Sequence, residues 1–363
     1  MRIAMIGTRG IPARSGGAER VVEELTRELA GRGHDVIVYG RRHYLGPDPR
    51  PPAGRVVVTG GLPGKHLDTP THSYTAMRDA LRREVDVVHV HSPGPALWCG
   101  LAARAGLPVV FTVHAPDWRR EKWSAPAKRV LRLGLRRGMR HATAVTAVSQ
   151  PLADELSAAY GRPVACVPNG VRPRPAPPPE RLAEWGLRPD GYVLNVGRIV
   201  PEKRLDALLH AWRETGISGR ELVVVGEMNS GSYARRCRRG APASVRFLGE
   251  QCGEALAALY THCSLVVQPS GLEGMSLVLL EAAVHGRCVL AADIPANRAA
   301  LGEAILYWSG RTSELGPEIR RCLDSEPLRA EMGSRARRNV LATRDWSAPA
   351  GALEGIYQEA MEA

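Results

Sequence analysis

The chain has 363 residues, 44% of them hydrophobic, and a formal net charge of +12 at pH 7. This length and composition indicate a globular protein with room for two domains, each with its own core. No apolar run approaches the roughly 20 residues that span a bilayer, and the first residues form a buried-strand pattern without the layout of a signal peptide. We therefore exclude a membrane-spanning helix and expect a cytoplasmic protein that can still contact the inner face of a membrane.

Cysteine spacing and charge restrict the chemistry further. The seven cysteines are odd in number and form no C-x-x-C pair, which argues against a disulfide framework or a zinc site and for a reducing compartment. The positive balance favours anionic partners, namely phosphates, nucleic acid or an acidic membrane surface, without choosing among them. Only four of the 49 basic residues are lysines, so a lysine is unusual in this chain.

Short apolar strands alternate with helical segments in the first half of the chain. A helix is predicted at residues 18–31, and strands are predicted at residues 3–6, 36–39, 56–59, 85–90, 109–113 and 144–148. Strands that alternate with helices are typical of a doubly wound parallel sheet. The first half is therefore predicted to be an α/β domain, residues 1–170.

The same pattern restarts after a proline-rich run at residues 172–179. A helix is predicted at residues 205–212, and strands are predicted at residues 192–196, 222–225, 245–248, 265–268 and 288–291. The prolines predict a stiff linker, residues 171–186, before a second α/β domain, residues 187–346. A C-terminal helix, residues 347–363, can cross back to the first domain. Two such domains place a ligand between them, at the carboxyl ends of the strands.

Two acidic residues, Glu273 and Glu281, flank the start of a predicted helix in the second domain. The apolar residues 275–280 follow a strand and a turn, so the first backbone N–H groups of the helix lie between the two carboxylates. Free N–H groups at a helix start bind anions. A nucleotide sugar has the matching order of hydroxyls, diphosphate and hydroxyls. A helix with a glutamate near each end is nevertheless common.

Cations and glycines follow other predicted strands. Arg198 comes after the strand at residues 192–196 and Lys203 precedes the next helix, where both can neutralise a diphosphate. They can equally be surface charges, although lysine is rare here. The glycine-rich loop that ends in Gly16 and Gly17 matches neither the dinucleotide fingerprint nor a P-loop. We interpret it as a loop that faces a ligand.

Three histidines lie on or after strands of the first domain. His114 follows the strand at residues 109–113 and could hydrogen-bond a sugar hydroxyl, although a lone histidine is more often structural. His89 and His91 alternate on one strand and therefore point to the same face. Further metal ligands are not evident, so we interpret this pair as structural or peripheral.

Residues 118–141 contain nine basic residues and one glutamate. The basic and apolar side chains separate onto opposite helical faces, with Arg129, Arg132, Arg136 and Arg140 on one and Leu131, Leu135, Met139 and Ala142 on the other. The pattern is typical of a helix that binds anionic lipid. It fits an ordinary surface helix equally well. A second basic run at residues 235–239 is interpreted as solvated.

These motifs together resemble the retaining glycosyltransferase family 4. They are the glycine loop, His114, the cations Arg198 and Lys203, and the segment from Glu273 to Glu281, in the family's order and spacing over nearly the whole chain. The resemblance implies the GT-B fold, with two Rossmann-like doubly wound parallel-sheet domains that face a central cleft. The opening Gly-Thr-Arg-Gly-Ile-Pro is similar to a bacterial subgroup associated with polysaccharide assembly.

The resemblance also implies roles for the residues. Arg198 and Lys203 hold the donor diphosphate, Glu281 binds the ribose, and Glu273 binds the transferred sugar with His114 near its reacting carbon. The remaining donor-binding positions are Gly16, Gly17, Gly249, Glu250, Gly274, Met275, Ser276 and Leu277. Many members have Phe-Gly at the positions of Met275 and Ser276, so the resemblance does not identify the donor sugar.

The sequence thus predicts transfer of a hexose-type sugar, with retention, from a nucleotide diphosphate sugar to a hydroxyl of a glycan, lipid-linked or natural-product acceptor. Retaining hydrolases use a close carboxylate pair, which these motifs lack, so front-face attack fits better and is what the family implies. We expect no cofactor and no metal, because protein cations serve the diphosphate. The rivals are a GT-B sugar-nucleotide epimerase and a basic nucleic-acid-binding protein. The second is disfavoured, because the chain lacks a groove-reading motif and has only two Phe for stacking.

Overall fold

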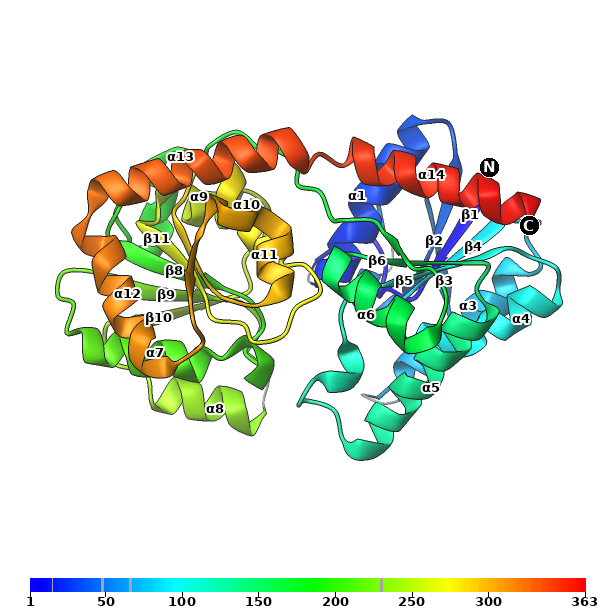
Figure 1. Ribbon diagram of the computed structural model, residues 1–363, viewed down its shortest axis with the longest axis horizontal. Coiled ribbons are helices and arrows are strands. Elements are labelled where there is room, and N and C mark those ends of the chain that lie inside the picture. The colour runs from blue at the N-terminus through cyan, green and yellow to red at the C-terminus, as the bar shows by residue number, and fades with distance from the viewer. Residues whose placement is uncertain (15, 47–48, 65–66, 229–230) are drawn as a thin grey trace. The chain divides into compact units, whose positions relative to one another are not determined.

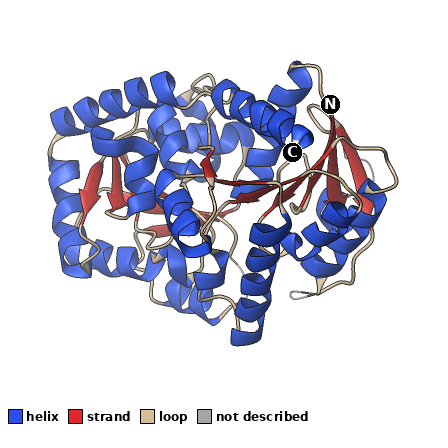
Figure 2. Ribbon diagram, turned by 45° about the vertical axis from the view of Figure 1, so that its right-hand side comes forward, coloured by secondary structure: helices blue, strands red, loops and turns tan. Residues whose placement is uncertain are grey.

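The computed structural model describes residues 1–14, 16–46, 49–64, 67–228 and 231–363 (Figure 1). These residues form two compact units, one made of Met1–Gly170 with Trp346–Ala363 and the other of Val171–Asp345. Each unit contains one parallel sheet with helices packed against it (Figure 2). The structure therefore has the two α/β domains with parallel sheets that the alternating strands and helices predicted.

The first unit has a seven-stranded sheet in the order β3-β2-β1-β4-β5-β6-β7. The strands are β1 (Arg2–Ile6), β2 (Asp35–Arg41), β3 (Arg55–Thr59), β4 (Val87–His91), β5 (Val109–Val113), β6 (Ala144–Ala147) and β7 (Ala165–Cys166). The helices are α1 (Gly17–Gly31), α2 (Arg42–Leu45), α3 (Asp68–Ala80), α4 (Cys99–Arg104), α5 (Ala125–His141), α6 (Gln150–Tyr160) and α14 (Ser347–Glu362). The strand order reverses between β1 and β4, and ligands of such sheets bind at the carboxyl ends beside this reversal.

The second unit has a six-stranded sheet in the order β10-β9-β8-β11-β12-β13. The strands are β8 (Tyr192–Val196), β9 (Glu221–Val225), β10 (Val245–Gly249), β11 (Leu265–Gln268), β12 (Val289–Ala292) and β13 (Leu306–Trp308). The helices are α7 (Leu205–Thr215), α8 (Ser232–Arg239), α9 (Gly253–His262), α10 (Leu277–Val284), α11 (Pro295–Leu301), α12 (Thr312–Asp324) and α13 (Glu326–Thr343). Here the order reverses between β8 and β11.

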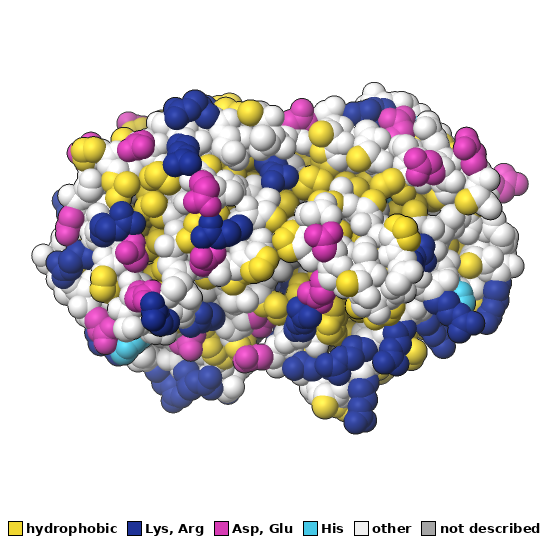
Figure 3. Space-filling model, in the orientation of Figure 1, with side chains coloured by type: hydrophobic (Ala, Val, Ile, Leu, Met, Phe, Trp, Pro, Cys, Tyr) yellow, Lys and Arg dark blue, Asp and Glu magenta, His cyan; other side chains and the backbone are white. Residues whose placement is uncertain are grey.

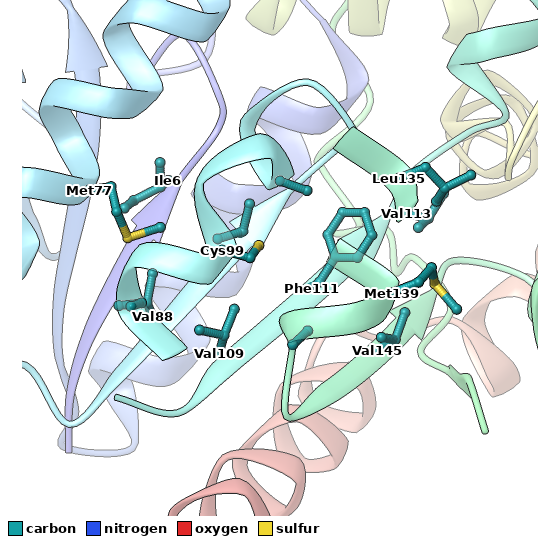
Figure 4. Packing of buried hydrophobic residues seen from close by; sticks show 14 of the residues in the cluster. Ile6, Met77, Val88, Cys99, Val109, Phe111, Val113, Leu135, Met139 and Val145 are labelled. Carbon is teal, nitrogen blue, oxygen red and sulfur yellow. The ribbon is translucent and has the colours of Figure 1, made fainter. Parts of the chain in front are cut away.

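Close packing of α5 on the sheet builds part of the first core. Phe111 on β5 is fully buried, and Leu135 and Met139 on α5 are 3% and 2% exposed. The three side chains lie in one apolar cluster (Figure 4). A methyl group on Gly138 would lie 2.5 Å from the Phe111 ring, so this glycine lets the helix approach the strand.

The proline-rich segment, predicted as a stiff linker at residues 171–186, is part of a domain in the structure. It belongs to the second unit, and Pro179–Trp185 forms a 3₁₀ helix that packs against α9. Leu182 is fully buried, and the ring Nε2 of His262 lies 2.8 Å from the carbonyl oxygen of Pro177. Prolines lack N–H donors, so the segment forms no strand pairing. It is held by buried side chains such as Leu182, by the Pro177 carbonyl, and by the amide of Val171, which donates to the carbonyl of Arg344 at 2.7 Å.

The last helix, α14, is part of the first unit. Glu354 on α14 accepts a hydrogen bond from Arg32, which follows the end of α1, at 3.2 Å, and it contacts Nε2 of His34 at 2.9 Å. Tyr357 on the same helix is fully buried. Among the described residues, no helix is both long enough and apolar enough to cross a membrane.

Candidate active site

The loop after β8 carries the two predicted cations. Gly197 follows the strand with φ +152°, and Lys203 ends the 3₁₀ helix Pro201–Lys203. The amide of Gly197 donates to the carbonyl of Val225 at 2.8 Å. A methyl group on Gly226 would lie 2.0 Å from the carbonyl oxygen of Gly197. The turn that presents Arg198 therefore rests directly on the backbone at Gly226.

Lys203 and Glu273 form an ion pair. The Lys203 Nζ contacts Oε1 of Glu273, and the two side chains are only 20% and 10% exposed. The amide of Gln268, at the end of β11, lies 3.5 Å from the same oxygen. The amide of Gly271 donates to the carbonyl of Glu202 at 3.0 Å, which joins the loops after β8 and β11. The sequence motifs did not identify Gln268 as a site residue. A polar residue at the end of an apolar strand is the signal that could have identified it.

The helix predicted to begin near Met275 begins at Leu277. Ser276 is the N-cap residue, with φ −79° and ψ 110°, and serine is a preferred residue at that position. The unpaired helix amides therefore start one to two residues later than predicted, and Glu281 lies in the second turn. The buried hydroxyl of Ser276 has no hydrogen-bond partner among the described residues.

Glu281 is held by a residue that the motifs did not reveal. The hydroxyl of Tyr260 on α9 donates to Oε2 of Glu281 at 3.1 Å. The Tyr260 ring is 1% exposed and stacks on His285 with 5.8 Å between ring centroids. The hydrogen bond helps to orient the carboxylate. Because Tyr260 precedes Glu281 by 21 residues, no local pattern links them.

The predicted donor-binding residues Gly249 and Glu250 lie at the end of β10. Gly249 has φ +69°, and its carbonyl accepts the amide of Gly226 at 2.8 Å. The side chain of Glu250 is exposed. The ends of β8, β9 and β10 are thus connected by backbone hydrogen bonds. The predicted donor-binding residues of the second unit lie at strand ends, in the loops that follow them, or in the first turns of α10.

In the first unit, the glycine loop is organised by an ion pair. Arg9 donates to Oε1 of Glu19 from its Nε at 3.0 Å and from its backbone amide at 3.2 Å. Burial opposes ionisation of Glu19, but the Arg9 charge holds its pKa below the usual value. Gly16 has φ +96°, and a methyl group there would lie 2.0 Å from Oε2 of Glu19. Gly17 is the first residue of α1. Residue 15 lies outside the described residues.

His114 follows β5 and contacts His91 at the end of β4. The His91 Nδ1 and the His114 Nε2 are 3.0 Å apart. Burial lowers the pKa of His114 to about 4, although Asp117 and Glu19 oppose the shift. His114 is therefore a neutral hydrogen-bonding group near pH 7.

His89 and His91 on β4 do share one face, with ring centroids 4.0 Å apart. The pair was interpreted as structural or peripheral, and the buried His91 reaches His114 because β4 and β5 are neighbours in the sheet.

The four arginines predicted to share one face of the basic helix α5 are all exposed. They are Arg129, Arg132, Arg136 and Arg140, and Figure 3 shows Lys and Arg side chains gathered over this helix. Val130 and Leu133 are also exposed, at 42% and 44%. Within the described ranges, no cluster of histidine, cysteine, aspartate and glutamate has the arrangement of a metal site.

Comparison with protein families assigns the chain. The model named Glycosyltransferase Family 4 matches residues 15–174, and that named Glycosyl transferases group 1 matches residues 183–339. A D-inositol 3-phosphate glycosyltransferase of Actinosynnema mirum is 30% identical over an alignment of 364 positions, and the alignment covers 89% of this chain and 87% of the relative. The chain belongs to the family 4 glycosyltransferases. The family predicted from the motifs is confirmed, and the protein is a glycosyltransferase.

Other similar proteins agree on the fold of the glycosyltransferase. A glycogen synthase of Mycobacterium tuberculosis is 28% identical, covering 98% of this chain and 94% of the relative. The sucrose-phosphate synthase structure of Thermosynechococcus elongatus superposes with a TM-score of 0.82 at 22% identity, covering 99% and 98% of the two chains. Anabaena Alr3699/HepE in complex with UDP-glucose superposes with a TM-score of 0.79 at 19% identity, covering 99% and 100%. The GT-B fold is thereby confirmed.

Proposed function

We propose that this glycosyltransferase moves a hexose-type sugar from a nucleotide diphosphate sugar to a hydroxyl group, with retention at the anomeric carbon and without a metal. The observation that carries the proposal is the arrangement of Lys203, Glu273 and the start of α10 in the second unit, which we call the donor half-site. Lys203 is paired with Glu273 at the end of β8 and β11, and the α10 start lies between Glu273 and Glu281. The similar Anabaena protein was solved with UDP-glucose, which supports a donor of this class.

The proposed chemistry follows from the charges of this half-site. A diphosphate bound beside Lys203, Arg198 and the α10 amides becomes more negative as the bond to the sugar breaks. Fixed cations and N–H dipoles stabilise that charge in a site that excludes water. Glu273 and Glu281 act as acceptors for sugar and ribose hydroxyls. The acceptor attacks from the face that the diphosphate leaves, so the departing phosphate takes the acceptor proton.

A donor screen with NMR detection of the product tests the proposal. We expect one nucleotide diphosphate sugar to be consumed with a hydroxyl acceptor, in the presence of EDTA, to give a product with the donor's anomeric configuration. An inverted product would refute retention, and loss of turnover with EDTA would refute metal independence. A donor that changes without any acceptor would identify an epimerase instead.

Tyr260 provides a sharper test of the ribose role proposed for Glu281. The variant Tyr260→Phe removes one hydroxyl from a carboxylate that must point at the ribose. We expect the donor KM to rise about 10-fold, the effect of losing a hydrogen bond to a charged group, while kcat stays unchanged. With a donor that lacks the ribose hydroxyls, the wild type and the variant should differ less than about 2-fold. An equal loss with both donors would contradict the role of Glu281.

The acceptor is proposed to be presented at the inner face of a membrane, where the first unit docks through α5. Its exposed arginines flank the exposed Val130 and Leu133, a combination that suits anionic lipid. Each basic residue near such a surface contributes about 1 kcal/mol. Replacing Arg129, Arg132 and Arg136 together by glutamine should weaken binding to phosphatidylserine vesicles about 100-fold.

A matched triple variant on α8 serves as the control. Arg235, Arg236 and Arg239 are also exposed on a short basic helix, and their replacement by glutamine removes the same charge. We expect this control to bind vesicles nearly as the wild type does. Equal losses in the two triple variants would show a non-specific charge effect and refute docking through α5.

A further inference from the structure

A buried cluster of polar side chains in the first unit reaches His114 through His91. The Nδ1 of His89 lies 2.6 Å from the hydroxyl of Tyr357 on α14, and its Nε2 lies 2.6 Å from the hydroxyl of Thr112. The Thr112 hydroxyl is in turn 2.6 Å from that of Thr146. His89 packs on His91, whose Nδ1 meets His114. Four strands and helices, β4, β5, β6 and α14, thus contribute polar groups to one network, and its last ring follows β5 in the candidate site.

The two histidines nearest the site are neutral, so their tautomers decide which nitrogen donates. Burial lowers the pKa of His91 well below its usual range, and burial lowers the pKa of His114 to about 4. In a neutral imidazole one nitrogen carries the proton and the other accepts. The bond between Nδ1 of His91 and Nε2 of His114 therefore has two possible directions, and each fixes both tautomers.

The surroundings of His91 favour one direction. Its Nε2 is buried and has no hydrogen-bond partner within the described part of the chain. If His114 donated to His91, the proton of His91 would sit on this Nε2 as a buried donor without an acceptor. If His91 donates, only a lone pair is left there. Buried donors without partners are rarer in proteins than under-satisfied acceptors, so donation by His91 costs less.

We propose that His91 is a positioning residue that donates from Nδ1 to Nε2 of His114 and so fixes the proton of His114 on Nδ1. His114 then presents an N–H donor, not a lone pair, to the substrate. His89 keeps the His91 ring in place, because its own two nitrogens are bound by Tyr357 and Thr112. The proposal rests on the proposed function, in which His114 contacts the transferred sugar.

Nitrogen NMR of the histidine side chains tests the tautomer directly. In the 15N-labelled protein near pH 7, the His114 signals, assigned by their loss in His114→Gln, should show a protonated Nδ1 and an unprotonated Nε2. The His91 signals should show a protonated Nδ1 as well. A protonated Nε2 on His114 would overturn the proposal, and this readout does not depend on whether the correct donor sugar is known.

Kinetics of two His91 variants separate positioning from structural support. His91→Asn retains an N–H donor near the Nδ1 position, whereas His91→Phe retains the ring shape without a donor. We expect His91→Phe to lower kcat about 10- to 100-fold, as for outer partners of functional histidines, with an unchanged donor KM. His91→Asn should recover most of that loss. Equal kcat in the two variants, or full turnover in His114→Gln, would overturn the positioning role.

His72→Phe is the matched control for the cost of removing a buried histidine. His72 is 1% exposed and its Nε2 lies 3.0 Å from the carbonyl of Gly40. His72→Phe should therefore lower the thermal midpoint as much as His91→Phe does. Its kcat per folded molecule should stay near that of the wild type. A similar loss of kcat in His72→Phe would attribute the effect of His91→Phe to instability and overturn the proposal.

Discussion

Lys203→Ala is expected to lower kcat/KM for sugar transfer about 1000-fold. Removing one fixed donor to a developing negative charge typically costs 10²- to 10³-fold. Here the change also leaves the Glu273 carboxylate without the cation that contacts it, so a negative group remains beside the leaving diphosphate. The measurement is the initial rate of transfer at subsaturating donor. The thermal midpoint should change little, because Lys203 ends a short 3₁₀ helix at the surface of the unit and is not part of the apolar core.

Two further variants make this prediction specific. In Lys203→Ala combined with Glu273→Gln, the repulsive carboxylate is gone, so the combined loss should be smaller than the product of the two single losses. Arg311→Ala removes a cation from an exposed ion pair with Glu314, where the arginine side chain is 75% exposed, and should leave transfer unchanged. Wild-type turnover in Lys203→Ala would remove the basis for the proposed donor site.

The strands were predictable because apolar runs and turn residues are local signals. The strands at residues 109–113, 192–196 and 265–268 have the predicted bounds in the structure. The strands β7 and β13 were missed, because two or three residues at a sheet edge show no period. The predicted parallel sheets also placed the candidate site residues near the carboxyl ends of strands. The glycosyltransferase family could therefore be predicted from the sequence motifs.

Contacts between residues far apart in the chain were not predictable in the same way. Lys203 and Glu273 were assigned to different parts of the donor, yet they form one ion pair across 70 residues. Such pairs depend on which strands are neighbours and how loops fold over the sheet edge. The α10 start is a subtler case. An apolar run does not distinguish the N-cap from the first helical turn, and Ser276 takes the N-cap position.

Gly226→Ala should both destabilise the protein and weaken donor binding. Gly226 has φ +147°, and a methyl group there would lie 2.0 Å from the carbonyl oxygen of Gly197, a backbone atom that cannot rotate away. The positive φ costs about 1 kcal/mol, and forcing two backbones apart costs about 2 kcal/mol more. A loss of about 3 kcal/mol should lower the unfolding midpoint of the second unit by about 10 °C. Calorimetry of the full chain measures this shift.

The same change reaches the site through the turn at residues 197–198. Because the methyl group displaces Gly197, it moves Arg198 away from the diphosphate, and a displacement of about 1 Å can cost 100-fold in rate. Gly219→Ala is the control, since Gly219 also has positive φ, +75°, but a methyl group there meets nothing within 4 Å. It should cost about 1 kcal/mol and leave the UDP or ADP affinity intact. If the two variants lose equal stability and equal nucleotide affinity, the contact between Gly226 and Gly197 does not position Arg198.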